Sequence, residues 1–212
     1  MKGFGNVVII GDSYSTFKGY NPEGYSFWYP QGGGSGAETD VEEVSDTWWY
    51  KLMWETGSNL VLNDSYSGST VCSTERKEIP GTHFNLRVDR MIRDGFFKNN
   101  KIDTIFVFGG TNDSWIDSPV GNVKYDGITE DDIRFVLPAF SALIQKLRAA
   151  SPSSKIIPLI NTDLKDEIAD GFEKICRHFG LTYVRFDVID KLSGHPSRKG
   201  MEEIKEAIKN LL

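Results

Sequence analysis

The stretch Val7–Phe17 reads VVIIGDSYSTF, and its four leading apolar residues run directly into Gly-Asp-Ser. A continuous apolar run of this length is typical of a strand buried on both faces of a parallel sheet. Ser13 then stands at the carboxyl end of that strand. Two interpretations are open for it: Ser13 is a nucleophile, or it caps a short helix that follows.

The same pattern recurs along the 212 residues, with helical patterns between the apolar runs. Strands that alternate with helices predict right-handed crossovers and a parallel sheet covered on both faces. The sequence therefore predicts an α/β fold with five central strands, and we expect a single domain over residues 1–212 because no repeat or linker interrupts the pattern. The predicted strands are Val7–Ile10, Leu60–Leu62, Thr104–Phe108, Ile156–Ile160 and Tyr183–Phe186.

Two of the helical patterns carry specific expectations about their ends. The segment 46–57 predicts a helix capped by Asp46 and ended by a glycine. An apolar stripe over residues 133–147 predicts another helix, and Pro138 within it is expected to cause a kink or a restart. Further helices are predicted over residues 166–180 and 197–212.

Composition excludes several classes of partner. The net charge of −6 argues against nucleic acid and anionic membranes, which attract clusters of Lys and Arg. No apolar run approaches the roughly 20 residues of a membrane span. The N-terminal residues lack the pattern of a secretory signal, so we expect a cytoplasmic protein, or a secreted one if this is a mature form. Cys72 and Cys176 lack metal-ligand spacing and are expected to be reduced structural thiols.

Small polar residues follow each predicted strand, in GDS, LNDSYSGST, FGGTND, INTD and DVIDKLSGHPS. In open parallel sheets, ligands bind outside the carboxyl ends of the strands. Turn chemistry explains any one of these segments by itself. The whole set, however, contains the groups that one reaction needs, namely acyl transfer.

Acyl transfer by a serine requires a base, because a hydroxyl is a poor nucleophile until its proton is removed. His83 and His178 lie within helical patterns, whereas His195 lies in SGHPS just before the last helix. Pro196 favours an extended backbone at His195, which would hold the imidazole on the same rim as Ser13. The other interpretation is that His195 only stabilises the start of the final helix.

A tetrahedral intermediate also needs donors for its oxyanion. Three candidates stand at the predicted strand ends: the backbone N–H of Ser13, the backbone N–H of Gly68 and the side-chain amide of Asn112. Gly68 can bring its N–H close to a ligand because it has no side chain. Alternatively, Gly68 is an ordinary turn residue and Asn112 stabilises a turn.

Together these segments resemble the SGNH hydrolases, also called GDSL-type esterases and lipases. GDSYS resembles the first block with its nucleophile, SYSGS the second with its glycine, GTND the third and GHPS the last. The four blocks occur in the family's order and span nearly the whole chain. The resemblance implies a three-layer α/β/α, flavodoxin-like fold. It also implies hydrolysis of a small-molecule ester with no metal and no organic cofactor.

The sequence departs from the family where the acid of the triad is expected. The family usually has this acid three residues before the histidine, and that position is Leu192 here. Asp190 is slightly favoured as the third catalytic group, with Asp187 and Asp163 as other candidates. A backbone carbonyl could also orient the imidazole and leave a Ser-His dyad. Asp12 is expected to organise the turn beside the nucleophile.

Aromatic residues suggest the substrate. The loop 20–29 is rich in aromatic side chains and includes Trp28, and Trp115 follows the third strand. Because aromatic faces stack on sugars and line acyl pockets, we expect Trp28 and Trp115, with Asp163, to bind substrate. The expected substrates are short acyl esters, including O-acetylated carbohydrates. The tryptophans of the helix at 46–57 are expected to be core residues instead.

Two functions of other classes are left open. The altered acid position is compatible with a catalytically weakened relative that binds sugars or other small molecules. A phosphate- or nucleotide-binding module would need a glycine-rich loop between a strand and a helix. The segment Gly32–Gly36 reads GGGSG, but it lies in a long loop with neither element next to it. The phosphate-binding hypothesis is therefore the weaker of the two.

Overall fold

The computed structural model describes residues 3–34, 36–73 and 77–212 of the chain. Its main sheet has five parallel strands in the order β2-β1-β3-β4-β5. This order is the flavodoxin-like one, in which the chain switches direction across the sheet between β1 and β3. The predicted α/β fold is confirmed, and β5 is shorter than expected. The strands are β1 (Asn6–Gly11), β2 (Asn59–Ser65), β3 (Thr104–Phe108), β4 (Lys155–Ile160) and β5 (Val184–Arg185).

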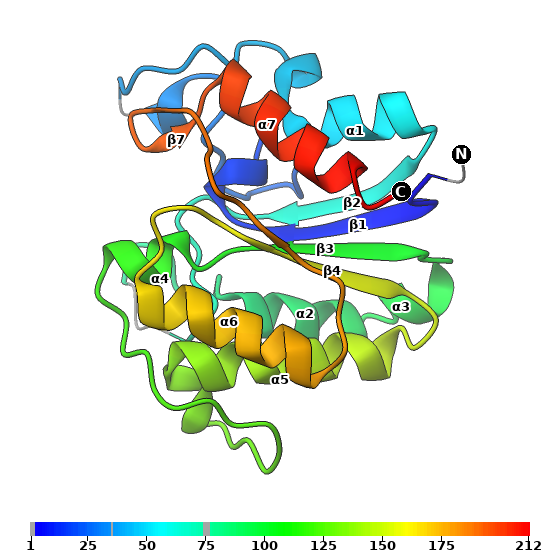
Figure 1. The fold of residues 1–212 in the computed structure, drawn as a ribbon, viewed down its shortest axis with the longest axis vertical. Coiled ribbons are helices and arrows are strands. Elements are labelled where there is room, and N and C mark those ends of the chain that lie inside the picture. Colours follow the sequence, from blue (N-terminus) through cyan, green and yellow to red (C-terminus); the bar gives the residue numbers. More distant parts are fainter. Residues whose placement is uncertain (1–2, 35, 74–76) are drawn as a thin grey trace.

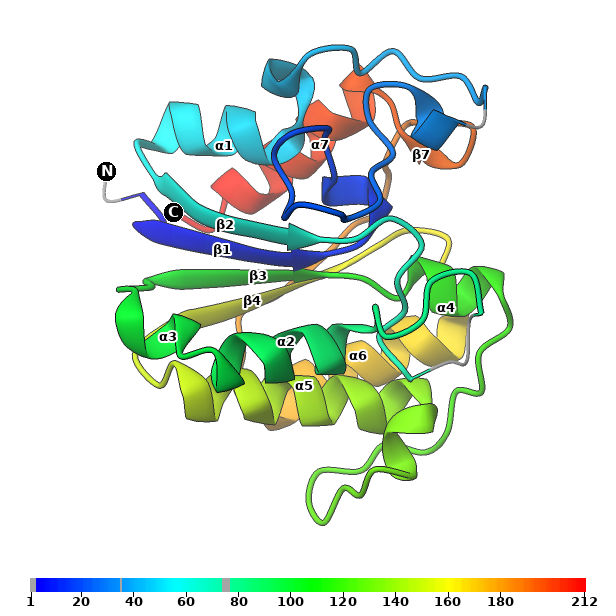
Figure 2. The same cartoon turned by 180° about the vertical axis from the view of Figure 1, so that it is seen from behind.

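Helices cover both faces of the sheet, as the two views in Figures 1 and 2 show. On one face lie α1 (Trp48–Thr56) and α7 (Arg198–Lys209). The other face carries α2 (Phe84–Arg93), α3 (Phe96–Asn99), α5 (Val136–Ala150) and α6 (Asp166–His178). The short α4 (Thr111–Trp115) follows β3, and a hairpin of β6 (Lys191–Leu192) and β7 (His195–Pro196) precedes α7. The described residues also form 3-10 segments at Ser13–Ser15, Gly32–Gly34, Val44–Asp46 and Asp132–Arg134.

Alternation along the strands explains why the sheet is buried on both sides. Val7 and Ile9 belong to the core beneath α1 and α7, whereas Val8 and Ile10 pack into the core beneath α2, α5 and α6. Successive strand residues point to opposite faces, so a continuous apolar run serves two cores at once. No helix in the described part of the chain is long and apolar enough to cross a membrane.

One prediction about a helix end is wrong and another is confirmed, each for a local reason. Thr47, not Asp46, caps α1, because its side chain accepts a hydrogen bond from the Tyr50 amide. Asp46 instead closes the preceding 3-10 segment. The restart expected near Pro138 is confirmed, because the apolar stripe is interrupted at Phe135, where the backbone is extended, and α5 begins at Val136. Pro138 thus lies in the first turn of α5, which has no hydrogen bond for proline to remove.

The other helix predictions need smaller changes. Within α1, Trp48 and Trp49 are buried as expected, but Trp54 is 80% exposed. His83 lies before α2 and caps it by accepting a hydrogen bond from the Leu86 amide, so it is not inside the helix. His178 is the last residue of α6.

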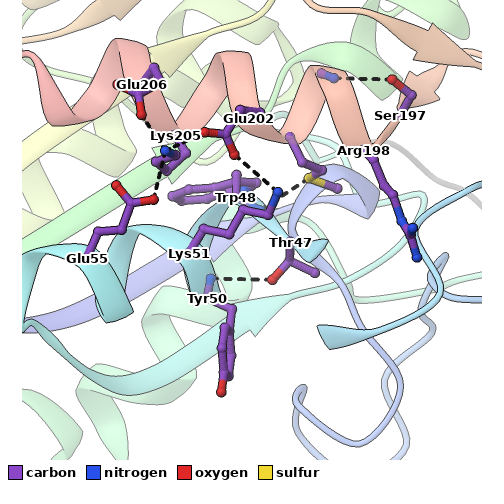
Figure 3. A network of polar contacts seen from close by, with 12 residues as sticks. Thr47, Trp48, Tyr50, Lys51, Glu55, Ser197, Arg198, Glu202, Lys205 and Glu206 are labelled. Atoms are coloured by element: carbon purple, nitrogen blue, oxygen red, sulfur yellow. Dashed lines mark hydrogen bonds and ion pairs between the residues drawn. The ribbon is translucent and has the colours of Figure 1, made fainter. Parts of the chain in front are cut away.

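A buried lysine joins α1 to α7 (Figure 3). Lys205 is only 2% exposed, and its ammonium contacts the carboxylates of Glu55, Glu202 and Glu206. A buried charge of this kind is tolerated only when it is paired. The network fixes α7 against α1, and so fixes the hairpin that leads into α7.

Candidate active site

The turn after β1 places Ser13 at the edge of the sheet where the strands end. Asp12 caps the 3-10 turn Ser13–Ser15 by accepting a hydrogen bond from the Tyr14 amide at 3.1 Å. Gly11 is required here, since a Cβ at this position would lie 2.5 Å from Ser65 Oγ on the neighbouring strand. Because β1 lies between β2 and β3, Ser13 stands at the switch point where such sheets bind ligands.

His195 reaches Ser13 from the hairpin of β6 and β7. Ser193 and Gly194 form the turn with φ values of 47° and 76°, the two positive values that a type I′ hairpin needs. The turn presents His195 Nε2 2.9 Å from Ser13 Oγ, across 182 residues of sequence. His195 and Ser13, which sequence analysis predicted to be the base and the nucleophile, therefore form a hydrogen bond.

The second nitrogen of the imidazole contacts a backbone carbonyl. His195 Nδ1 lies 3.2 Å from the Ser193 carbonyl oxygen. Leu192, at the family's acid position, pairs directly with His195 across the hairpin. This geometry corrects the preference for Asp190, because the Asp190 carboxylate accepts a hydrogen bond from the Ser197 hydroxyl instead. The arrangement corresponds to the other hypothesis, in which a backbone carbonyl orients the imidazole of a Ser-His dyad.

The remaining carboxylate candidates also lie elsewhere. Asp187 is exposed. Asp163 forms an ion pair with Lys191 at 2.8 Å, and its side chain is 73% exposed. Asp163 was expected to contact substrate. In the structure its carboxylate is already paired with the ammonium of Lys191, and the substrate contact stays a prediction.

Aromatic rings surround the imidazole. Trp28 stacks on His195 with ring centroids 3.5 Å apart and planes 9° from parallel. Trp115 meets the same ring edge-on at 5.4 Å, and Tyr14 lies at 5.4 Å as well. One face of Trp28 is therefore covered by the imidazole, whereas Trp115 is 50% exposed and can offer a face to a ligand.

This enclosure changes the protonation of His195. Burial lowers the pKa of His195 to about 4, Lys191 acts in the same direction, and the bond to the Ser193 carbonyl opposes them. From the sequence we would expect the ordinary histidine pKa of about 6.5, because burial is not visible there. At neutral pH the imidazole is therefore uncharged, which is the state that can accept a proton.

The loop after β2 lies beside the turn that carries Ser13, since the Tyr66 amide donates to the Gly11 carbonyl at 3.1 Å. Gly68 adopts a φ of 86°, which favours glycine. Asn112, in the first turn of α4, donates its side-chain amide to the Ser69 carbonyl at 2.9 Å. The Asp113 carboxylate accepts hydrogen bonds from the Val71 amide at 2.9 Å and the Cys72 amide at 3.1 Å. The second and third sequence blocks are thus bonded to each other.

A buried arginine that sequence analysis missed supports this edge. Arg87 of α2 is 1% exposed and forms an ion pair with Asp64. Its guanidinium also donates to the Gly11 carbonyl at 2.9 Å and to Ser69 Oγ at 3.3 Å. The sequence carried this signal, since Arg87 lies three residues after Phe84 and four before Met91, on the buried face of its helix. A charged residue there needs buried partners.

Asp12 directly precedes Ser13 and is 1% exposed. Burial raises the pKa of Asp12 to about 7, while the Tyr14 amide lowers it and the charge of Asp113 raises it. Its contact with the Tyr14 amide agrees with the expected role in organising the turn.

Two further sequence features can be placed in the structure. The described part of the chain contains one acidic group with metal-ligand spacing, Glu55, Glu202 and Glu206, and Lys205 already contacts all three. The glycine-rich segment forms a 3-10 turn at Gly32–Gly34, and its Ser35 lies outside the described residues.

A serine and histidine in contact at the carboxyl edge of a flavodoxin-like sheet define the SGNH class of hydrolases. The chain belongs to the GDSL-like lipase/acylhydrolase family, whose sequence pattern matches residues 5–212.

Solved structures agree with this assignment. A protein from Bacteroides uniformis described as a GDSL-like lipase is 40% identical, with a TM-score of 0.84 over 98% of this chain and 95% of that one. One from Bacteroides ovatus is 38% identical, with a TM-score of 0.83 over 98% and 97%. An acetyl xylan esterase from Butyrivibrio proteoclasticus, 16% identical, shares the fold at a TM-score of 0.59 over 98% of this chain and 63% of that one. No curated protein matches the chain.

Proposed function

We propose that this protein is a serine ester hydrolase that cleaves small acyl esters, with O-acetylated carbohydrates as its substrate class. The observation that carries the proposal is the 2.9 Å contact between His195 Nε2 and Ser13 Oγ. A hydroxyl bonded to a neutral imidazole is the arrangement that activates serine as a nucleophile.

In the proposed reaction, Ser13 Oγ attacks the ester carbonyl carbon while His195 Nε2 accepts the hydroxyl proton. The Nδ1 proton stays hydrogen-bonded to the Ser193 carbonyl, which holds the imidazole in the required tautomer. The oxyanion receives hydrogen bonds from the Ser13 and Gly68 amides and from Asn112. The imidazolium then protonates the leaving alcohol, and water releases the acyl group by the same route.

The imidazole bonds a neutral carbonyl where a triad has a carboxylate, so another group must stabilise its positive charge. Trp28 offers the π face that stacks on the imidazole of His195. A cation over an aromatic face gains about 0.5–2 kcal/mol, more where water is excluded. In this proposal the face of Trp28 that covers His195 stabilises the base.

The enclosure of the site favours a small acyl group. Ser13 is 2% exposed and His195 is 4% exposed, so little room is open at the reacting atoms. Trp115 provides a half-exposed ring next to them, of the kind that stacks on sugars. The distant fold likeness to an acetyl xylan esterase supports the same substrate class.

Hydrolysis of p-nitrophenyl acetate tests the reaction, with Ser13→Ala as the control. We expect the substitution to abolish turnover, and equal rates in the two proteins would refute the proposal. A series of longer acyl chains and a panel of acetylated sugars then test the substrate class. Faster turnover of the longer chains would remove the carbohydrate assignment while leaving the esterase assignment in place.

One observation favours a second candidate function, a relative that binds acylated sugars with little turnover. Leu192 occupies the acid position, so the imidazole lacks the carboxylate that this position usually supplies. Binding of an acetylated sugar by calorimetry, without release of acetate and with the same affinity in Ser13→Ala, would establish this alternative.

A further inference from the structure

Three backbone carbonyls of the histidine hairpin, on both sides of His195, have a side-chain partner. The Ser193 carbonyl contacts the imidazole itself at 3.2 Å. The Tyr14 hydroxyl donates a hydrogen bond to the Gly194 carbonyl at 2.6 Å. The Tyr29 hydroxyl donates one to the Pro196 carbonyl at 2.7 Å. The carbonyls on both sides of His195 are thus fixed by phenols.

We propose that Tyr14 and Tyr29 form a tyrosine clamp that holds the backbone of His195 in line with Ser13. The clamp positions the base, the task that a carboxylate performs through the imidazole in a triad. This inference rests on the proposed function. The two hydroxyls bond backbone carbonyls of the hairpin and not Ser13 Oγ or His195 Nε2, so both tyrosines act as positioning residues.

Each tyrosine of the clamp is next in sequence to a residue that contacts the side chain of His195. Tyr14 directly follows Ser13, so its hydroxyl links the nucleophile turn to the hairpin. Tyr29 directly follows Trp28, the residue that stacks on the imidazole. Each tyrosine therefore bonds the hairpin next to His195 while its chain neighbour contacts the side chain of His195.

Both phenols are rigidly supported and stay protonated. Tyr14 and Tyr29 are fully buried, and burial raises the pKa of each hydroxyl above its ordinary value. The Tyr14 ring packs edge-on against Phe108 at the end of β3, with centroids 5.7 Å apart. The Tyr29 carbonyl accepts a hydrogen bond from the Lys18 amide at 2.9 Å. The clamp thus anchors the hairpin to the sheet through Tyr14, and to the loop that carries Trp28 through Tyr29.

A kinetic test uses Tyr14→Phe, Tyr29→Phe and the double variant, which remove the hydroxyls and keep the rings. Tyr183→Phe is the matched control, because its hydroxyl donates to Glu173 at 2.7 Å on α6, outside the site. A displacement near 1 Å costs about 100-fold in rate. We therefore expect kcat to fall roughly 10-fold in each single variant and about 100-fold in the double variant, with KM within twofold. Unchanged kcat in the double variant would overturn the inference.

A second measurement reads the position of the base without requiring turnover. The Nδ1 proton of His195 gives a proton NMR signal in nitrogen-15-labelled protein, assigned by its loss in His195→Asn. We expect this signal to shift or broaden in both clamp variants and to persist in Tyr183→Phe.

The two measurements separate the clamp from the proposed function. An unchanged NMR signal in both clamp variants would overturn the clamp even if kcat fell. If the parent protein has no esterase activity but the signal still changes, the clamp stands and the proposed function fails.

Discussion

Asp190→Asn is expected to leave most of the catalytic rate intact. In a Ser-His-Asp triad, changing the acid to its amide lowers kcat by about 10⁴, which is about 5 kcal/mol of transition-state stabilisation. Here the Asp190 carboxylate bonds the Ser197 hydroxyl, and the imidazole bonds the Ser193 carbonyl at 3.2 Å. We therefore expect kcat/KM for p-nitrophenyl acetate to fall less than about tenfold, or ~1.4 kcal/mol.

The same substitution should lower stability slightly. The amide that replaces the carboxylate can still accept from Ser197, but a charge-assisted hydrogen bond becomes a neutral one, which costs about 1 kcal/mol. For a chain of this size, such a loss lowers the melting temperature by about 2–4 °C. Ser197→Ala is the control for the rate, because it removes the same hydrogen bond and keeps the carboxylate. It also removes the cap that Ser197 provides to the Gly200 amide of α7, so its loss of stability should be the larger of the two. A fall of about 10³ or more in Asp190→Asn, absent from Ser197→Ala, would show that the carboxylate serves the base and would refute the reasoning.

Four further predictions concern the site. Because burial lowers the pKa of His195 to about 4, kcat/KM should stay level from neutral pH to about 5 and fall as the imidazole protonates near 4; a pH–rate profile with its midpoint near 6.5 would contradict this. Asn112→Ala should lower kcat by about 100- to 1,000-fold and change KM much less, whereas a change confined to KM would mean that the amide binds only the ground state. Asp12 has a folded pKa of about 7, so its contribution to stability is present in acid and lost as pH rises from about 4 to 7. Asp12→Asn, which keeps an acceptor for the Tyr14 amide, should therefore raise the melting temperature relative to the parent more at pH 8 than at pH 4, and an equal change at both would refute it. Trp115→Ala also removes a ring in contact with His195, so the test compares KM between substrates. KM for acetylated sugars should rise by roughly five- to tenfold and KM for nitrophenyl acetate much less, because the stacking it removes is worth about 1 kcal/mol; equal rises in KM on both substrates would argue against sugar stacking.

The amino-acid sequence by itself determined the layout of the fold. Apolar runs such as Val7–Ile10 place residues on both faces of a sheet, and each run is long enough to specify a strand without help from the rest of the chain. Parallel strands share one carboxyl edge, so the segments holding Ser13, Gly68, Asn112 and His195 were expected together there. These inferences depend on local periodicity and on chain connectivity, both of which are visible in sequence.

The ends of the helices were harder to predict from the sequence, because several neighbouring residues can each act as the cap. Asp46 and Thr47 are both good capping residues, and only the observed backbone shows that Thr47 bonds the Tyr50 amide. Pro138 predicted a kink or a restart, and only the structure shows a restart, with α5 beginning two residues before the proline.

Only the tertiary structure decided how the base is held. A hydrogen bond depends on a few tenths of an ångström, and the partners of His195 come from segments separated by as many as 182 residues. Leu192 showed that the usual acid was missing, but no sequence pattern could choose the Ser193 carbonyl over Asp190. The stacking of Trp28 and the two tyrosine bonds have the same origin, because the orientation of a buried ring is set by packing of the whole molecule.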